Sequence, residues 1–230
     1  MFVVTPLKST SHLSKETGAS FIELVIVLLI ISILSVMTLL SFKSDKKFLA
    51  DSQAYLIVDM FQEARQRALT QHETLRVEIN KTRNTIRLIN ENIAGNAADD
   101  LEIRVLRLEN PKNVVVETPP QNISNSPTDV SPIPNIIFKT SVHPSSLNDS
   151  VATLRFLKTG KVVDAGSNAI GDNAVVTGAT IFVWMPNYSA SDQPLNTGSV
   201  IRAISVLGST GSAKYWKCPV TNNQCSNWTN

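Results

Sequence analysis

A long apolar segment near the N-terminus constrains this chain more than any other feature. From Leu24 to Phe42 there is no charged residue, and a carboxylate, Glu23, stands directly before the run. As an α-helix, with a rise of about 1.5 Å per residue, the segment would measure about 30 Å, the hydrocarbon thickness of a bilayer. A carboxylate inside that layer costs about 2.5–3.5 kcal/mol, less near its edge, and is usually paired. The sequence therefore predicts a membrane helix over residues 19–42 whose acid needs a partner.

Three interpretations of this segment compete. A secretory signal peptide would have a shorter apolar region, of about 7–15 residues, followed by a cleavage site of small residues, whereas "SFKSDKK" follows here. An ordinary single-pass anchor fits the length, but lysines flank both ends and orient it poorly, and it gives Glu23 no role. Cleavage after Gly18 explains more. It makes Ala19 a new cationic amino terminus one helical turn from Glu23, and the same group on a neighbouring subunit could neutralise that acid.

The stretch "KETGASFIELVIVLLIISIL" resembles the class III signal of type IV prepilins and pseudopilins. That signal has a polar leader ending in Gly, four mostly apolar residues, Glu, and then a long apolar helix. The resemblance implies that a prepilin peptidase removes the leader, residues 1–18, between Gly18 and Ala19 and N-methylates Ala19. It also implies that Glu23 acts in filament assembly. Two departures are Ala19, where the family most often has Phe, and Leu40, near the position where many major pilins have a proline. The second departure favours a minor subunit.

The helix is predicted to continue beyond the apolar run. Residues 43–72 contain no Gly or Pro and are rich in helix formers, so one long helix should run from about Ala19 to Thr70. Apolar residues recur at near-helical spacing along this second half, which predicts an amphipathic helix packed on a domain outside the membrane. The apolar positions are Phe48, Leu49, Leu56, Met60 or Phe61, Ala64 and Ala68.

The remainder of the chain, residues 73–230, is predicted to be a β domain. Alternating apolar residues at 75–79 and 86–88, separated by "NKTRN", indicate a β-hairpin, and residues 100–109 and 113–117 should extend its sheet. Five prolines among Asn and Ser mark residues 118–134 as a surface loop. Further strands are expected in "NIIFKT", "ATLRFLKTGKVV" with a turn at Thr159 and Gly160, "ATIFVWM" and "SVIRAISVLG".

This order of elements resembles one pseudopilin subgroup, the family of general secretion pathway protein H and the minor pilins FimT and FimU. The resemblance covers most of the chain and is most specific in the first 80 residues. It implies an α+β, pilin-like fold with the long N-terminal helix packed against two antiparallel β-sheets. The segment 118–150 is longer than the usual loops of that family.

Two cysteines, Cys218 and Cys225, stand close to the C-terminus in "CPVTNNQC". Their spacing does not match a CxxC zinc or redox pair, and no histidine lies near them in sequence. If this part of the chain is exported, a disulfide between them is expected; two unpaired thiols in a cytosolic protein are the alternative. The formal net charge of +2 argues against a generic nucleic-acid coat or a polybasic membrane binder, but it is compatible with a small local basic patch.

No motif for catalysis or for a metal stands out. The three histidines, His12, His72 and His143, fall in no nucleophile or metal pattern, and "GSTGS" lacks the frame of a phosphate loop. We expect no enzymatic activity, no cofactor and no metal.

One basic and aromatic stretch allows a second function. "SAKYWKC" interleaves Lys214 and Lys217 with Tyr215 and Trp216, which could contact phosphates and stack on bases. Some FimT-like minor pilins bind DNA through a C-terminal G-R-x-R motif. Here the corresponding stretch, Gly211 to Lys214, lacks the first arginine, so a final strand with lysines facing solvent is the competing interpretation.

The sequence as a whole predicts a minor pilin or pseudopilin of a type II secretion pseudopilus or a type IV pilus, at or near the filament tip and priming assembly. Its partners would be the prepilin peptidase, other pilins or pseudopilins and an inner-membrane assembly platform. It would span the bacterial inner membrane once, with the C-terminal domain in the periplasm, before entering the filament. The alternatives are a FimT-like minor pilin that binds DNA during natural transformation, or a plain single-pass membrane-anchored domain.

Overall fold

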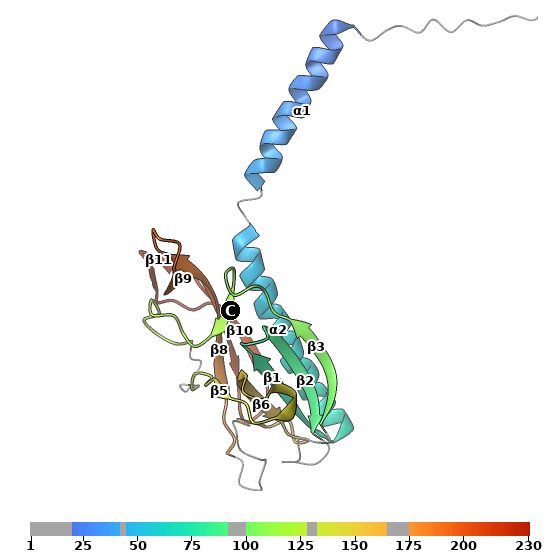
Figure 1. Cartoon of the computed structure of the whole chain (residues 1–230), viewed down its shortest axis with the longest axis vertical. Helices are drawn as coiled ribbons and strands as arrows, with labels where there is room; N and C mark the ends of the chain where they lie inside the picture. Colours follow the sequence, from blue (N-terminus) through green and yellow to red (C-terminus); the bar gives the residue numbers. More distant parts are fainter. Residues whose placement is uncertain (1–19, 42–44, 92–99, 128–132, 165–174) are drawn as a thin grey trace, which may run out of the picture. The chain divides into compact units, whose positions relative to one another are not determined.

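The computed structural model describes residues 20–41, 45–91, 100–127, 133–164 and 175–230 (Figure 1). Side chains are described up to residue 35 in the first range and from residue 47 in the second. The chain divides into two compact units, residues 1–43 and 44–230, which are described separately.

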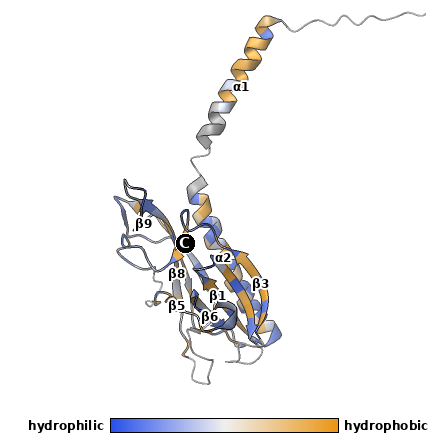
Figure 2. Cartoon of the chain, viewed as in Figure 1, coloured by the Kyte–Doolittle hydropathy of each residue, from blue (hydrophilic) through white to orange (hydrophobic). Residues whose placement is uncertain are grey.

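The first unit contains helix α1, Phe21–Ser41. Its apolar residues continue around the whole helix rather than along one stripe, so α1 has no polar face (Figure 2). Neither buried core cluster of the protein contains a residue of α1. The amino-terminal prediction of a helix is confirmed from residue 21 onward, while its start at Ala19 and its passage through residues 42–44 lie outside the described residues.

The second unit begins with helix α2, Asp45–Gln71, which contacts strands of both sheets. Its buried face is built largely from alanines, which allow the helix to approach the sheets closely. The predicted amphipathic packing is confirmed, but the prediction for Phe48 was wrong, because this side chain is 70% exposed. Fully buried positions on α2 are Ala50, Ala54, Ile57, Met60, Phe61, Ala64 and Ala68.

The larger sheet, sheet A, is antiparallel and has the order β3-β2-β1-β6-β5, with β7 paired to β6 (Figure 1). The predicted hairpin is β1 and β2, with Val77 opposite Leu88. Leu75, Val77 and Ile79 face the core beneath α2, so the alternate residues of β1 point to the other face. The strands are β1 Thr74–Asn80, β2 Thr85–Glu91, β3 Leu101–Arg107, β5 Lys139–Thr140, β6 Ser150–Phe156 and β7 Val162–Asp164.

The second sheet, sheet B, is also antiparallel, with the order β10-β9-β8-β4. Residues 113–117 were expected to extend the first hairpin, but this was wrong, because β4 pairs with β8. A small hairpin of β11 and β12 follows β10. The strands are β4 Val115–Glu117, β8 Ala179–Tyr188, β9 Pro194–Val206, β10 Ala213–Cys218, β11 Val220–Thr221 and β12 Gln224–Cys225.

Other segments match their predictions to different degrees. The strand expected in "NIIFKT" is reduced to Lys139 and Thr140. The described part of the proline-rich loop, residues 118–127 and 133–134, forms no strand, although Ile123 makes an isolated parallel bridge to Cys225. A 3-10 turn, η2, Pro144–Ser146, lies between β5 and β6.

Two glycines hold the turns of two hairpins together. Gly160 and Gly211 both have positive φ, at 78° and 66°, which suits glycine in a tight turn. A Cβ on Gly211 would lie 2.5 Å from the carbonyl oxygen of Gly160, so no other residue fits there without movement. The β6–β7 and β9–β10 turns therefore depend on each other.

The main core lies between α2 and the two sheets. Phe61 of α2 packs against Phe156 of β6 with ring centroids 5.9 Å apart, and both side chains are fully buried. The described chain therefore has an α+β fold in which a helix packs on antiparallel sheets, as the sequence predicted.

Candidate functional site

Helix α1 carries the first candidate site. Glu23 is its only charged residue and lies in the first turn, where its backbone amide donates to the carbonyl of Ser20. The large apolar side chains between Phe21 and Leu34 are 42–82% exposed. A helix with this surface needs an apolar environment or apolar partners, since so large an exposed patch is rare on a soluble protein.

Two serines of α1, Ser32 and Ser35, have their hydroxyl groups satisfied within the helix. The hydroxyl of Ser32 donates to the carbonyl of Leu29, and that of Ser35 donates to Ile31, each at 2.7 Å. Because both serine hydroxyl groups already donate to the backbone, neither needs a hydrogen bond to water, which suits burial in an apolar medium. Among the residues that the structure describes, no helix is long and apolar enough to cross a membrane. Gly18 and Ala19, the predicted cleavage site and methylated residue, lie outside the described residues.

The two cysteines form the expected disulfide, Cys218–Cys225. It belongs to a second buried cluster, on the face of sheet B away from the main core, together with Phe182, Trp184 and Trp216. Trp228 from the C-terminal tail packs on this cluster, with its ring 6.1 Å from that of Phe182. The disulfide thus holds the tail against sheet B.

The basic and aromatic stretch of the sequence forms strand β10, so its side chains alternate between two faces. Trp216 is 6% exposed and its indole nitrogen donates to Ser205, while Lys214 lies 4.2 Å above its ring. Tyr215 points to the α2 side, stacks on Tyr55 at 4.7 Å and donates its hydroxyl to Asp51. The structure therefore does not gather Lys214, Tyr215, Trp216 and Lys217 on one face.

The contact of Tyr215 with Asp51 changes the acidity of both groups. Burial raises the pKa of the Tyr215 phenol, and its hydrogen bond to Asp51 raises it further. Burial works against ionisation of Asp51, but hydrogen bonds from Arg202 and Tyr215 outweigh it and hold the pKa of this carboxyl below its usual value. Asp51 is therefore a carboxylate that orients its neighbours.

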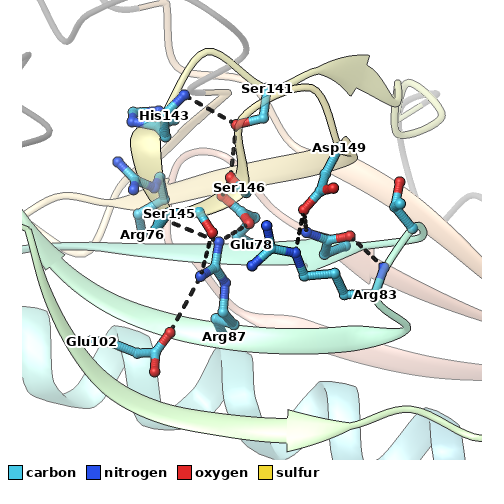
Figure 3. A network of polar contacts seen from close by, with 12 residues as sticks. Arg76, Glu78, Arg83, Arg87, Glu102, Ser141, His143, Ser145, Ser146 and Asp149 are labelled. Atoms are coloured by element: carbon cyan, nitrogen blue, oxygen red, sulfur yellow. Dashed lines mark hydrogen bonds and ion pairs between the residues drawn. The ribbon is translucent and has the colours of Figure 1, made fainter.

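A buried network of charges covers the face of sheet A that points away from α2 (Figure 3). Arg87 pairs with Glu78 and reaches Glu102 at 3.3 Å. Nearby, the Arg76 guanidinium pairs with Glu91 and lies 2.6 Å from Asp100, and Arg155 lies 2.6 Å from Glu91. Four of these side chains, those of Arg76, Glu78, Glu91 and Arg155, are at most 2% exposed.

One segment, residues 141–149, closes over this network, and we call it the cover segment. Ser146 donates its hydroxyl to Glu78 at 3.1 Å, and Asn80 donates to Asp149 at 2.7 Å (Figure 3). The network thus fixes the cover segment to sheet A. Sequence reasoning missed these residues; the alternating charges of "LRVEIN" and "TIRLINE" were the available signal, but alternation does not reveal that a segment covers that face.

The network contains a serine and a histidine, but they do not form a nucleophile and base. Ser141 accepts a hydrogen bond from the backbone amide of His143, not from its ring, at 3.2 Å. Burial lowers the pKa of the His143 imidazole, and the nearby Arg76 lowers it further, so the ring is neutral at pH 7. Among the described residues no group of three potential ligands could hold a metal ion. The arrangement supports a structural role.

Comparison with known proteins gives one likeness. No family model matches the sequence, and no curated protein matches it. Among solved structures, the chain is similar to the type IV minor pilin FimU of Pseudomonas aeruginosa strain PAO1. The two are 13% identical, the match covers 76% of this chain and 92% of that one, and the TM-score is 0.41.

Proposed function

We propose that this protein is a minor pilin or pseudopilin, a structural subunit of a type IV pilus or a type II secretion pseudopilus. The observation that carries the proposal is α1, which is apolar on all sides, has Glu23 as its single charge and precedes a domain with its own core. Such a helix can lie in the membrane before assembly and pack among other apolar helices afterwards. In the membrane and in the filament alike, removing the apolar surface of the helix from water, at about 25 cal/mol per Å², stabilises the helix in its place.

Glu23 has a specific role in this proposal. Cleavage after Gly18 by a prepilin peptidase gives Ala19 a cationic amino group, which is then N-methylated. A subunit entering the filament places Glu23 beside the amino group of a neighbouring subunit. The pair removes the cost of an isolated carboxylate among apolar helices and favours one register of packing.

The β domain supplies the surface that distinguishes this subunit from its neighbours. Its disulfide suits an oxidising compartment such as the periplasm. The proposed route places the uncleaved chain in the inner membrane, with residues 1–18 in the cytoplasm, until an assembly platform lifts it into a filament. A position at or near the filament tip, priming assembly, follows the predicted similarity to the minor subunits.

The mature N-terminus tests processing. Mass spectrometry of the protein extracted from membranes should find a chain that begins at methylated Ala19 in cells with a prepilin peptidase. Gly18→Ala should leave the leader attached while membrane insertion continues. A normally processed Gly18→Ala chain would contradict the proposed cleavage, and an intact leader in the parent protein would favour a plain membrane anchor.

Filament incorporation tests the role of Glu23. Glu23→Leu should be processed and inserted normally, yet be lost from sheared filament fractions, because the charge pair no longer forms. Glu23→Asp, which keeps the carboxylate, is the matched control and should retain part of the incorporation. Equal incorporation of all three proteins would exclude the charge pair. The genes beside this one, for secretion or for pilus proteins, would separate the two systems.

A further inference from the structure

A basic cavity lies at the start of α2, where three cationic side chains from three elements line the same space. Its volume is about 350 Å³, and no Asp or Glu is among its lining residues. The cations are Lys47 of α2, Arg202 of β9 and Lys217 of β10, and Val200, Pro219 and Val220 are its apolar wall. We call this space the basic pocket.

The cations of the basic pocket are not balanced by the acids around them. Arg202 and Lys217 are directly opposite each other in the β9–β10 register, an arrangement of like charges that destabilises a sheet. Asp51, one turn beyond Lys47 on α2, is the carboxylate that pairs with Arg202. Three cations thus share one described carboxylate partner, so the pocket keeps an excess positive charge.

One donor of the pocket is buried and held by hydrogen bonds, and the other two are exposed. Arg202 is 8% exposed; its Nε donates to Asp51 and its Nη1 donates to the carbonyl of Ile201 at 2.9 Å. Lys47 and Lys217 are exposed, and Lys217 lies 5.6 Å above the Tyr215 ring. One oriented guanidinium with two lysines is a donor set suited to a phosphate group.

We propose that the basic pocket binds the phosphate group of an anionic phospholipid. This rests on the proposed function, in which α1 is embedded in a membrane before assembly. Lys47 follows Ser41, the last residue of α1, by six positions, and Lys43 and Lys46 stand between them in the sequence. The headgroup phosphate pairs with the three cations, and the apolar wall contacts the glycerol backbone.

The structure favours a lipid over a nucleic acid as the source of the phosphate. Base stacking needs an accessible aromatic ring beside the cations. Three aromatic residues lie within two positions of the pocket's cations in the sequence. Trp216 is buried and Tyr215 packs on Tyr55, while Phe48, which follows Lys47, is 70% exposed. One exposed ring falls short of the series of aromatic side chains on which successive bases of a single strand stack.

The test uses the full chain in non-ionic detergent micelles at low, constant ionic strength. Tryptophan fluorescence, from the three tryptophans of the β domain, reports the midpoint of thermal unfolding. Phosphatidylglycerol should raise this midpoint, and the same mole fraction of phosphatidylcholine should not. Lys47→Gln and Lys217→Gln should each raise the amount of phosphatidylglycerol at half-effect by about tenfold. Both lysines are exposed, so the variants should fold.

Matched controls and competing anions make the outcome decisive. Lys158→Gln and Lys161→Gln, two exposed lysines between β6 and β7, should respond to the lipid as the parent does. Without lipid, Lys217→Gln should unfold at a higher temperature, because the like-charge pair is relieved. Equal shifts with both lipids, or in all variants, would overturn the proposal. So would a full response to inorganic phosphate alone, or displacement of the lipid by a single-stranded oligonucleotide.

The result is separable from the proposed function. Lipid binding by a chain that is never processed or incorporated would contradict the proposed pilin role but would still support phosphate binding in the basic pocket. Normal processing and incorporation with no selective lipid response would support the pilin role and contradict phosphate binding in the basic pocket.

Discussion

The Nε atom of Arg155 lies 2.6 Å from Oε2 of Glu91, and each side chain is only 2% exposed. The other oxygen of Glu91 pairs with Arg76. One carboxylate therefore pairs with two buried guanidinium groups, from β1 and β6, while Arg76 has Asp100 as a second acidic partner.

Glu91→Gln removes that charge and leaves two buried arginines facing a neutral amide. We expect a loss of about 3–5 kcal/mol in the free energy of unfolding, the usual cost of removing one partner of a buried pair. Urea denaturation followed by circular dichroism measures it. Glu102→Gln, which alters a pair whose carboxylate is 49% exposed, should cost less than about 1 kcal/mol. Similar losses in the free energy of unfolding for the two variants would show that burial does not determine how much each ion pair of the network stabilises the fold.

His143 should make the stability of the β domain depend on pH. Burial and Arg76 hold its pKa below the usual 6.5, so protonation favours the unfolded chain, where the pKa is ordinary. The contribution of the neutral His143 imidazole to the free energy of unfolding is complete above pH 6.5. It is lost as the pH falls below that value towards the pKa of His143 in the folded protein. Thermal unfolding at pH 7.5 and pH 5.5 should show the decrease, and His143→Asn should reduce it. An unchanged pH dependence in the variant would exclude His143 as its source.

Reduction of the disulfide should loosen the C-terminal tail. The loop between Cys218 and Cys225 has a sequence separation of 7, for which chain entropy gives a stabilisation of about 2.5 kcal/mol. Urea midpoints with and without a reductant measure the loss, and Cys218→Ser with Cys225→Ser should match the reduced protein. Increased exposure of Trp228 to an aqueous quencher is expected in both. A reduced protein as stable as the oxidised one would mean that the aromatic cluster alone holds the tail.

His72 occupies a position that favours glycine. It follows the last residue of α2 and has a φ of 57°, the left-handed conformation common after a helix C-terminus. His72→Gly removes the steric cost of a side chain there and should stabilise the domain by about 0.5–1 kcal/mol. Asn84→Gly is a useful contrast, with a φ of 56°, because the Asn84 side chain donates to the carbonyls of Leu108 and Glu109. That variant should be destabilised.

The elements that the sequence predicted well are those set by local periodicity. The alternation of Leu75, Val77 and Ile79 with a turn before Ile86 was sufficient for the β1–β2 hairpin, because a strand with one buried face has period two. The disulfide also followed from two cysteines close together in a chain predicted to be exported. Phe48 shows where periodicity fails as a predictor of burial. Its helical spacing allowed it to be buried, but the buried residues of α2 begin at Ala50.

Local sequence patterns were sufficient to predict an apolar helix with one acid, its amphipathic continuation and most strands, because these depend on residues that are neighbours along the chain. Long-range packing places β4 in sheet B, buries Arg76 and Arg155 around Glu91, and sets Arg202 opposite Lys217. Each of these depends on which distant segments meet. Local patterns do not encode that choice, because many pairings would bury similar apolar area.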